Sequence, residues 1–105
     1  MKVELLYFDG CPNWTVADER LARALVVIGR DDLTVHRRRV ETVEEASAVS
    51  FTGSPTVLID GRDPFATGDE QVGLACRVYS TPQGLGGSPT VEQFVEVLSS
   101  LSEEV

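Results

Sequence analysis

The chain is poor in histidine, in cysteine and in positive charge. Its 105 residues include one histidine and two cysteines, and nine Lys and Arg oppose seventeen Asp and Glu, which gives a formal net charge of −8. The single histidine, His36, lies among arginines and far in sequence from either cysteine. This position argues against a Cys–His nucleophilic pair and against a histidine-based metal site. Because an acidic chain repels phosphate, we expect neither nucleic acid nor a membrane surface as a partner.

Long apolar runs are missing as well. No stretch approaches the roughly 18 residues that a membrane-spanning helix needs. Met1 and Lys2 lead directly into a predicted strand, without the pattern of a signal peptide. We therefore expect a cytoplasmic protein. Two cysteines are too few for a disulfide framework. A chain of 105 residues that is 42% hydrophobic is large enough for one core, so residues 1–105 are predicted to form a single domain.

One stretch combines a strand signal, a turn, a thiol and a helix signal. Residues 3–8 (VELLYF) form an alternating, mostly apolar run that predicts a strand, and Asp9-Gly10 is a turn signal. Cys11 and Pro12 follow, and Pro12 suits the first turn of the predicted helix. A thiolate at a helix N-terminus is stabilised by unpaired N–H groups and by the helix dipole. We therefore expect the pKa of Cys11 to fall below its free value of about 8.5, which makes Cys11 the candidate reactive cysteine.

Periodicity and turn residues predict seven elements in the order β-α-β-α-β-β-α. The expected strands cover residues 2–8, 32–40, 56–60 and 74–79, and the expected helices cover 12–28, 43–49 and about 90–101. Capping boxes begin at Thr42 and Thr90, the arginines of 37–39 indicate an edge strand, and residues 102–105 are expected to fray. This order predicts an α/β domain, in which helices cover both faces of an open mixed sheet.

The element order, Cys11 at a strand-to-helix turn, and Gly53-Ser54-Pro55-Thr56 before the third strand together resemble the thioredoxin-like fold. The resemblance covers nearly the whole chain. It implies a three-layer α/β/α domain with a mixed four-stranded sheet. It also implies that Pro55 is the cis-proline that packs beside the active-site cysteine in that family. Pro89 shares the local Ser-Pro-Thr sequence, but a helix follows it, so Pro89 does not match that position.

The chain departs from the family at the second cysteine of the Cys-x-x-Cys motif. Here the motif is Cys11-Pro12-Asn13-Trp14, so the usual intramolecular disulfide cannot form. The segments YFDGCPNW, GSPTVLIDGRDPFA and GLACRVY resemble a group of small bacterial thioredoxin-family proteins that are sometimes labelled alkylmercury lyase. Organomercurial lyases themselves have a different and longer fold, in which two cysteines and an aspartate act. Cys11, Cys76 and Asp9 are the same residue types on another scaffold.

Two classes of function fit these residues. In the first, a monothiol or atypical dithiol oxidoreductase without a cofactor, the Cys11 thiolate attacks a disulfide of a protein or of a low-molecular-weight thiol. Cys76 or an external thiol then resolves the mixed disulfide. In the second, a thioredoxin-fold binding module, Cys11 and Trp14 form a ligand pocket, or the two cysteines hold a soft metal ion such as Hg²⁺. Alkylmercury cleavage is a third, enzymatic alternative.

The resemblance and the local patterns also nominate substrate-binding residues. Trp14 would cover the first helical turn and shield the thiol, or act as a binding platform. The loop that ends at Thr56 would offer its backbone to a bound peptide or thiol, and Arg77 would hold an anion or be an exposed strand residue. Cys76 is either a core residue or a resolving cysteine. The second alternative needs the Cα atoms of Cys11 and Cys76 to lie within about 7 Å, a distance that the sequence does not give. The nominated substrate-binding residues are Pro12, Trp14, Ser54, Pro55, Thr56 and Arg77.

Overall fold

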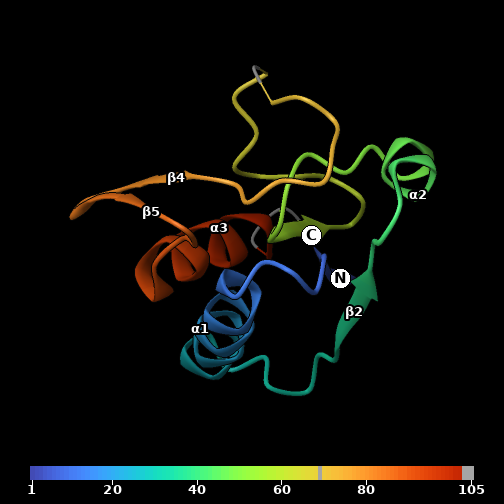
Figure 1. The fold of residues 1–105 in the computed structure, drawn as a ribbon. Coiled ribbons are helices and arrows are strands. Elements are labelled where there is room, and N and C mark those ends of the chain that lie inside the picture. Colours follow the sequence, from blue (N-terminus) through green and yellow to red (C-terminus); the bar gives the residue numbers. More distant parts are fainter. Residues whose placement is uncertain (69, 103–105) are drawn as a thin grey trace.

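The computed structural model describes residues 1–68 and 70–102, so the part of the predicted tail over 103–105 lies outside the described residues (Figure 1). The elements in chain order are β1 (Val3–Tyr7), α1 (Asn13–Val27), β2 (Val35–Arg39), α2 (Val43–Ala48), β3 (Thr56–Ile59), β4 (Tyr79–Thr81), β5 (Gly84–Gly86) and α3 (Val91–Ser102). The predicted boundaries of β1 and of the three helices agree with these to within a few residues.

The three-stranded sheet has the order β2-β1-β3, so β1 is its central strand. β1 pairs in parallel with β2 and antiparallel with β3, which makes the sheet mixed. Because side chains alternate across a strand, Val3 and Leu5 face one side of β1 and Leu6 faces the other. All three are buried, so β1 is covered on both faces.

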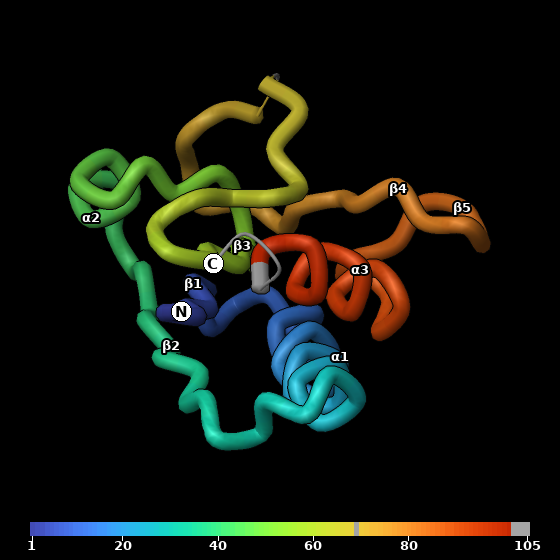
Figure 2. Tube along the Cα trace, turned by 180° about the vertical axis from the view of Figure 1, so that it is seen from behind, coloured from blue at the N-terminus to red at the C-terminus, as the bar shows by residue number. Residues whose placement is uncertain are grey.

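Helices cover the two faces of this sheet. On one side α1 and α3 lie next to each other, and their buried residues pack with Val3 and Leu5 in one core cluster that includes Leu21 and Phe94 (Figures 1 and 2). On the other side Leu6 packs in a second, smaller cluster with residues of α2 and of the segment that follows it. The layers are therefore helix, sheet and helix, with the larger core under α1 and α3.

The capping and edge predictions are confirmed. The backbone N–H of Glu45 donates to Thr42 Oγ1 at the start of α2, and Thr90 and Gln93 exchange both bonds of a capping box at the start of α3. β2 is an edge strand, and its three arginines, residues 37–39, are exposed.

The predicted four-stranded sheet is wrong. Within the described residues the sheet has three strands, and β4 and β5 form a separate hairpin. Two local causes are visible. At the outer edge of β3, the N–H of Ile59 donates to the carbonyl of Arg62 in the turn that follows. This N–H is therefore not available to pair with a fourth strand. The chain before β4 makes only a single bridge, Ser54 to Cys76, and then diverges, so strand pairing begins at Tyr79 with β5 as the partner.

Candidate functional site

Cys11 lies at the turn that joins β1 to α1. Its backbone N–H donates to the carbonyl of Phe8 at 3.2 Å, which closes the Asp9-Gly10 turn that the sequence predicts. Pro12 is the N-cap of α1, one residue before the helix begins, and its side chain is exposed. The Cys11 side chain has no exposed surface, and its thiol donates to the carbonyl of Ser54 at 3.6 Å. The turn and the helix therefore direct this thiol inward, toward the loop that precedes β3.

The Gly53–Thr56 loop forms the second wall of the site. The Ser54–Pro55 peptide bond is cis, as the family resemblance implied. The Thr56 hydroxyl donates back to the carbonyl of Gly53 at 2.5 Å, which holds the loop closed on itself. Ser54, Pro55 and Thr56 are all buried, and within the described residues the hydroxyl of Ser54 has no hydrogen-bond partner. The contact between this loop and the Cys11 thiol, through the carbonyl of Ser54, is therefore buried.

A later part of the chain, residues 73–77, lies over this loop, and we call it the covering segment. Three backbone hydrogen bonds join it to Phe51 and Ser54. Gly73 N–H donates to Phe51 O at 3.0 Å, Ser54 N–H donates to Ala75 O at 2.8 Å, and Arg77 N–H donates to Ser54 O at 2.9 Å. Gly53 allows the close approach. A Cβ built on it would lie 3.0 Å from the Cβ of Arg77 and 3.2 Å from the carbonyl oxygen of Ala75.

The covering segment brings Cys76 to Cys11. Cys76 is bridged to Ser54, the residue whose carbonyl accepts from the Cys11 thiol. The pKa of Cys76 is raised above its ordinary value, first by hydrogen bonding with Cys11 and then by desolvation and by the Cys11 charge, as expected of neighbouring thiols. Cys76 is exposed and Cys11 is buried, and both are free thiols. The proximity that the sequence left open is therefore present, with one thiol at the surface and the other below it.

Arg77 anchors the covering segment from inside the protein. Its guanidinium pairs with the carboxylate of Asp63 at 2.5 Å and donates to the carbonyl of Phe65 at 3.1 Å. Only 5% of the Arg77 side chain is exposed. The guanidinium carbon also lies 4.7 Å from the centre of the Tyr79 ring. The alternative of an exposed strand arginine is wrong, because Arg77 is buried. Its nominated role as an anion ligand stays a prediction, and these contacts give it a structural role.

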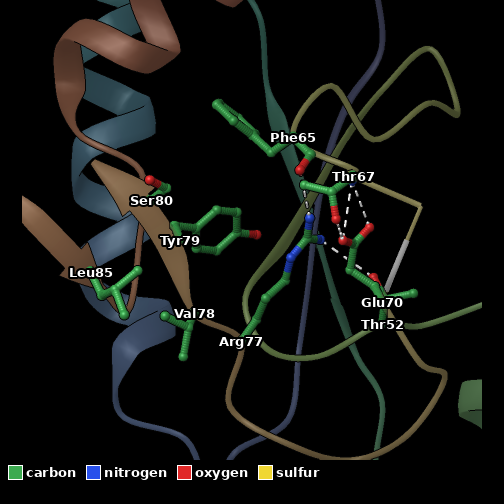
Figure 3. A pocket seen from close by; sticks show the side chains of 9 residues that line it. All are labelled: Thr52, Phe65, Thr67, Glu70, Arg77, Val78, Tyr79, Ser80 and Leu85. Carbon is green, nitrogen blue, oxygen red and sulfur yellow. Dashed lines mark hydrogen bonds between the residues drawn. The ribbon is translucent and has the colours of Figure 1, made fainter. Parts of the chain in front are cut away.

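A cavity of about 430 Å³ opens beside Arg77 (Figure 3). Its lining mixes apolar and polar side chains: Phe65, Val78, Tyr79 and Leu85 together with Thr52, Thr67, Glu70, Arg77 and Ser80. The Tyr79 hydroxyl donates to the carbonyl of Pro55 at 2.5 Å, and burial raises the pKa of Tyr79. A hydrogen bond from Thr67 lowers the pKa of Glu70, which is half-buried. Neither cysteine lines this cavity, so it is a neighbour of the thiol pair and not part of it.

Trp14 lies on the core side of the site. Its ring stacks on Tyr7 with 4.1 Å between the ring centroids, and it packs against the larger core cluster. Trp14 therefore joins the first turn of α1 to the end of β1, three residues after Cys11 in the chain. Its role as a binding platform stays a prediction. Asp9 is exposed, in contrast to the buried Cys11, and its backbone N–H donates to Glu41.

Sequence reasoning missed Asp63, Phe65 and Tyr79 as parts of this site. Asp63 and Phe65 lie in a polar, Gly-containing stretch with no periodicity, which indicates a loop and nothing about which side chains turn inward. The only available signal was an arginine, Arg77, inside a run of otherwise small and apolar residues. A buried arginine needs a counter-charge, and Asp63 is one of the nearest acidic residues in the chain.

Comparisons with known protein families, with curated proteins and with solved structures give no match for this chain. Over residues 1–68 and 70–102, no helix is long and apolar enough to cross a membrane. Over the same ranges, no group of three or more His, Cys, Asp and Glu side chains is placed to hold a metal ion. The chain is a small α/β domain with a mixed sheet, and its candidate site consists of the two cysteines, the cis-proline loop and the covering segment.

Proposed function

We propose that this chain is a thioredoxin-like thiol–disulfide oxidoreductase in which Cys11 and Cys76 form the redox pair. The observation that carries the proposal is that both cysteines meet at Ser54, whose carbonyl accepts from the Cys11 thiol and whose backbone is bridged to Cys76. The resemblance to the thioredoxin-like fold is supported by the strand pairing, with β1 parallel to β2 and antiparallel to β3. It is also supported by the position of Cys11 directly before α1. Cys76 supplies the second thiol, which is missing from the Cys-x-x-Cys motif because Trp14 stands at that position.

The exchange involves two electrons and two protein sulfurs. A thiolate of the pair attacks one sulfur of a substrate disulfide, the substrate S–S bond breaks, and the second substrate sulfur leaves as a thiolate. The other thiol of the pair loses its proton and attacks the protein sulfur of the mixed disulfide, which forms the Cys11–Cys76 bond and releases the first substrate sulfur. The substrate is reduced and the protein is oxidised. Two molecules of a low-molecular-weight thiol reverse this step, reduce the pair again and leave as their own disulfide.

The test is to oxidise the monomer with glutathione disulfide and to count free thiols, with intact mass measured in parallel. We expect both thiols to disappear and the mass to fall by two hydrogen atoms, with recovery on addition of a dithiol. Reduction of a model disulfide by glutathione should then be catalysed by the wild type and be lost in Cys76→Ala. A protein that keeps both thiols, or that accumulates glutathione on each cysteine separately, would contradict the proposal.

The same thiol contact also supports the second candidate, a module that binds a soft metal ion, because thiolates are preferred ligands of such ions. The two candidates differ in turnover. Stoichiometric binding of Hg²⁺ that requires both cysteines, without any catalysed disulfide reduction, would favour the binding module. Catalysed reduction favours the oxidoreductase.

A further inference from the structure

We infer that Cys76, rather than Cys11, carries the partner in the mixed disulfide, and that Cys11 is the buried thiol that resolves it. This inference rests on the proposed function and reverses the order of attack expected from the sequence. The sequence points to Cys11 because of its place before a helix. The structure gives solvent access to Cys76 alone of the two thiols, because Cys11 has no exposed surface and Cys76 is exposed.

The direction of approach supports this assignment. In thiol–disulfide exchange the attacking, central and leaving sulfurs lie roughly in line. For a Cys11–Cys76 disulfide, an attack on Cys76 comes from the side away from Cys11, and Cys76 is open to solvent. An attack on Cys11 would come from the side away from Cys76, and that side is closed, because the Cys11 side chain has no exposed surface. An outside thiol therefore reaches only the Cys76 sulfur unless the covering segment moves.

The covering segment is held too firmly to move at little cost. Three backbone hydrogen bonds join it to residues 51–54, and the buried Arg77–Asp63 pair ties its end to the loop over residues 61–65. Gly53 packs so closely against it that an added Cβ would lie only 3.0 Å from the Cβ of Arg77. Exposure of Cys11 requires these contacts to open together, whereas exposure of Cys76 requires nothing.

The chemistry balances with Cys76 as the outer sulfur. An external thiolate attacks Cys76, the Cys11–Cys76 bond breaks, and Cys11 leaves as a thiolate and takes up a proton. A second external thiol attacks the partner sulfur, a disulfide of the two external thiols leaves, and Cys76 takes up a proton. Two external thiols are oxidised and the internal disulfide is reduced. The raised pKa of Cys76 agrees with this order, because the thiol of higher pKa is the poorer leaving group.

The experiment uses two single-cysteine variants and the wild type, each reduced and then mixed with glutathione disulfide under native conditions. Cys11→Ala should accumulate a stable mixed disulfide on Cys76, because nothing resolves it. Cys76→Ala should react at Cys11 at least about tenfold more slowly, because reaction requires local opening. The wild type should pass through a transient adduct to the internal disulfide. Circular dichroism checks that both variants are folded.

A measurement on the wild type keeps the test independent of the variants. Brief alkylation of the reduced protein, followed by peptide mapping, should label Cys76 before Cys11. If Cys76→Ala reacts as fast as Cys11→Ala while the wild type still forms the internal disulfide, the division of roles is overturned and the redox pair stands. If the wild type instead keeps a stable adduct like that of Cys11→Ala, Cys11 does not resolve it, and the proposed function fails as well.

Discussion

Arg77 and Asp63 form a buried ion pair, with 2.5 Å between Nη1 of the guanidinium and Oδ2 of the carboxylate and with 5% and 14% of the two side chains exposed. Loss of one partner leaves the other charge buried without compensation. We therefore expect Arg77→Met to lower the free energy of unfolding by about 3 kcal/mol or more. Urea unfolding measures this change.

The exposed pair of Arg37 and Asp18 is a matched control, since its ions are 2.9 Å apart but 53% and 23% exposed. We expect Arg37→Met to cost between about 0 and 1 kcal/mol, because water screens such pairs. Equal losses for the two arginine variants would show that burial of the Arg77 pair does not determine its contribution.

Gly53 has a φ of +117° and is in contact with the covering segment, whereas Gly84 has a φ of +109° and nothing within 4 Å of an added Cβ. Gly84→Ala should cost about 1–2 kcal/mol for the positive φ alone. Gly53→Ala should cost about 1–3 kcal/mol more, because its Cβ overpacks against Arg77. We also expect faster alkylation of Cys11 in Gly53→Ala, since the added atom pushes the covering segment away from the loop. Similar free energies of unfolding for the two variants would mean that the covering segment moves to accommodate the added Cβ at little cost.

Tyr79 should make the protein lose stability at high pH. Its pKa is raised by burial, so the folded chain keeps the phenol proton while the unfolded chain loses it above its ordinary pKa of about 10. The unfolded state then binds fewer protons, and the free energy of unfolding falls as the pH rises above 10. In Tyr79→Phe this part of the fall should be absent. At neutral pH the same variant should cost about 1–2 kcal/mol, because the carbonyl of Pro55 loses its donor. Urea unfolding at several pH values checks both expectations, and an unchanged alkaline slope would contradict the first.

Cys76 should alkylate more slowly than an isolated thiol at neutral pH, because its raised pKa leaves less thiolate. Cys11→Ala removes the first cause of that shift, the hydrogen bond to Cys11, and also the Cys11 charge. We expect the pH profile of Cys76 alkylation to move to lower pH in this variant and the rate at neutral pH to rise. In urea, where the contact is lost, wild type and variant should react alike at Cys76. If the pH profile of Cys76 alkylation does not move in folded Cys11→Ala, then Cys11 is not the cause of the raised pKa of Cys76.

The layers of this fold could be predicted because they depend on local patterns. Val3, Leu5 and Leu6 indicate by their alternation which faces of β1 are covered, and Thr42 and Thr90 mark where two helices begin. The hairpin could not be predicted, because Gly84-Leu85-Gly86 has no strand propensity of its own and is extended only through pairing with β4. The same limit applies to the site. Cys11 was found from its place before a helix, whereas the burial of Arg77 depends on Asp63, which lies in a loop without any pattern.

The two thiols are 65 positions apart in the chain, and only folding brings them into contact. Folding and oxidation are therefore linked in a thermodynamic cycle. The proposed disulfide would close a loop of this length and stabilise the folded state by about 4 kcal/mol. By the same cycle, the folded protein holds its disulfide more strongly than the unfolded chain does, so each loss of native structure makes the bond easier to reduce. The thermal melting point would then report the redox state, and chains that unfold in a reducing compartment would lose the disulfide and its stabilisation together.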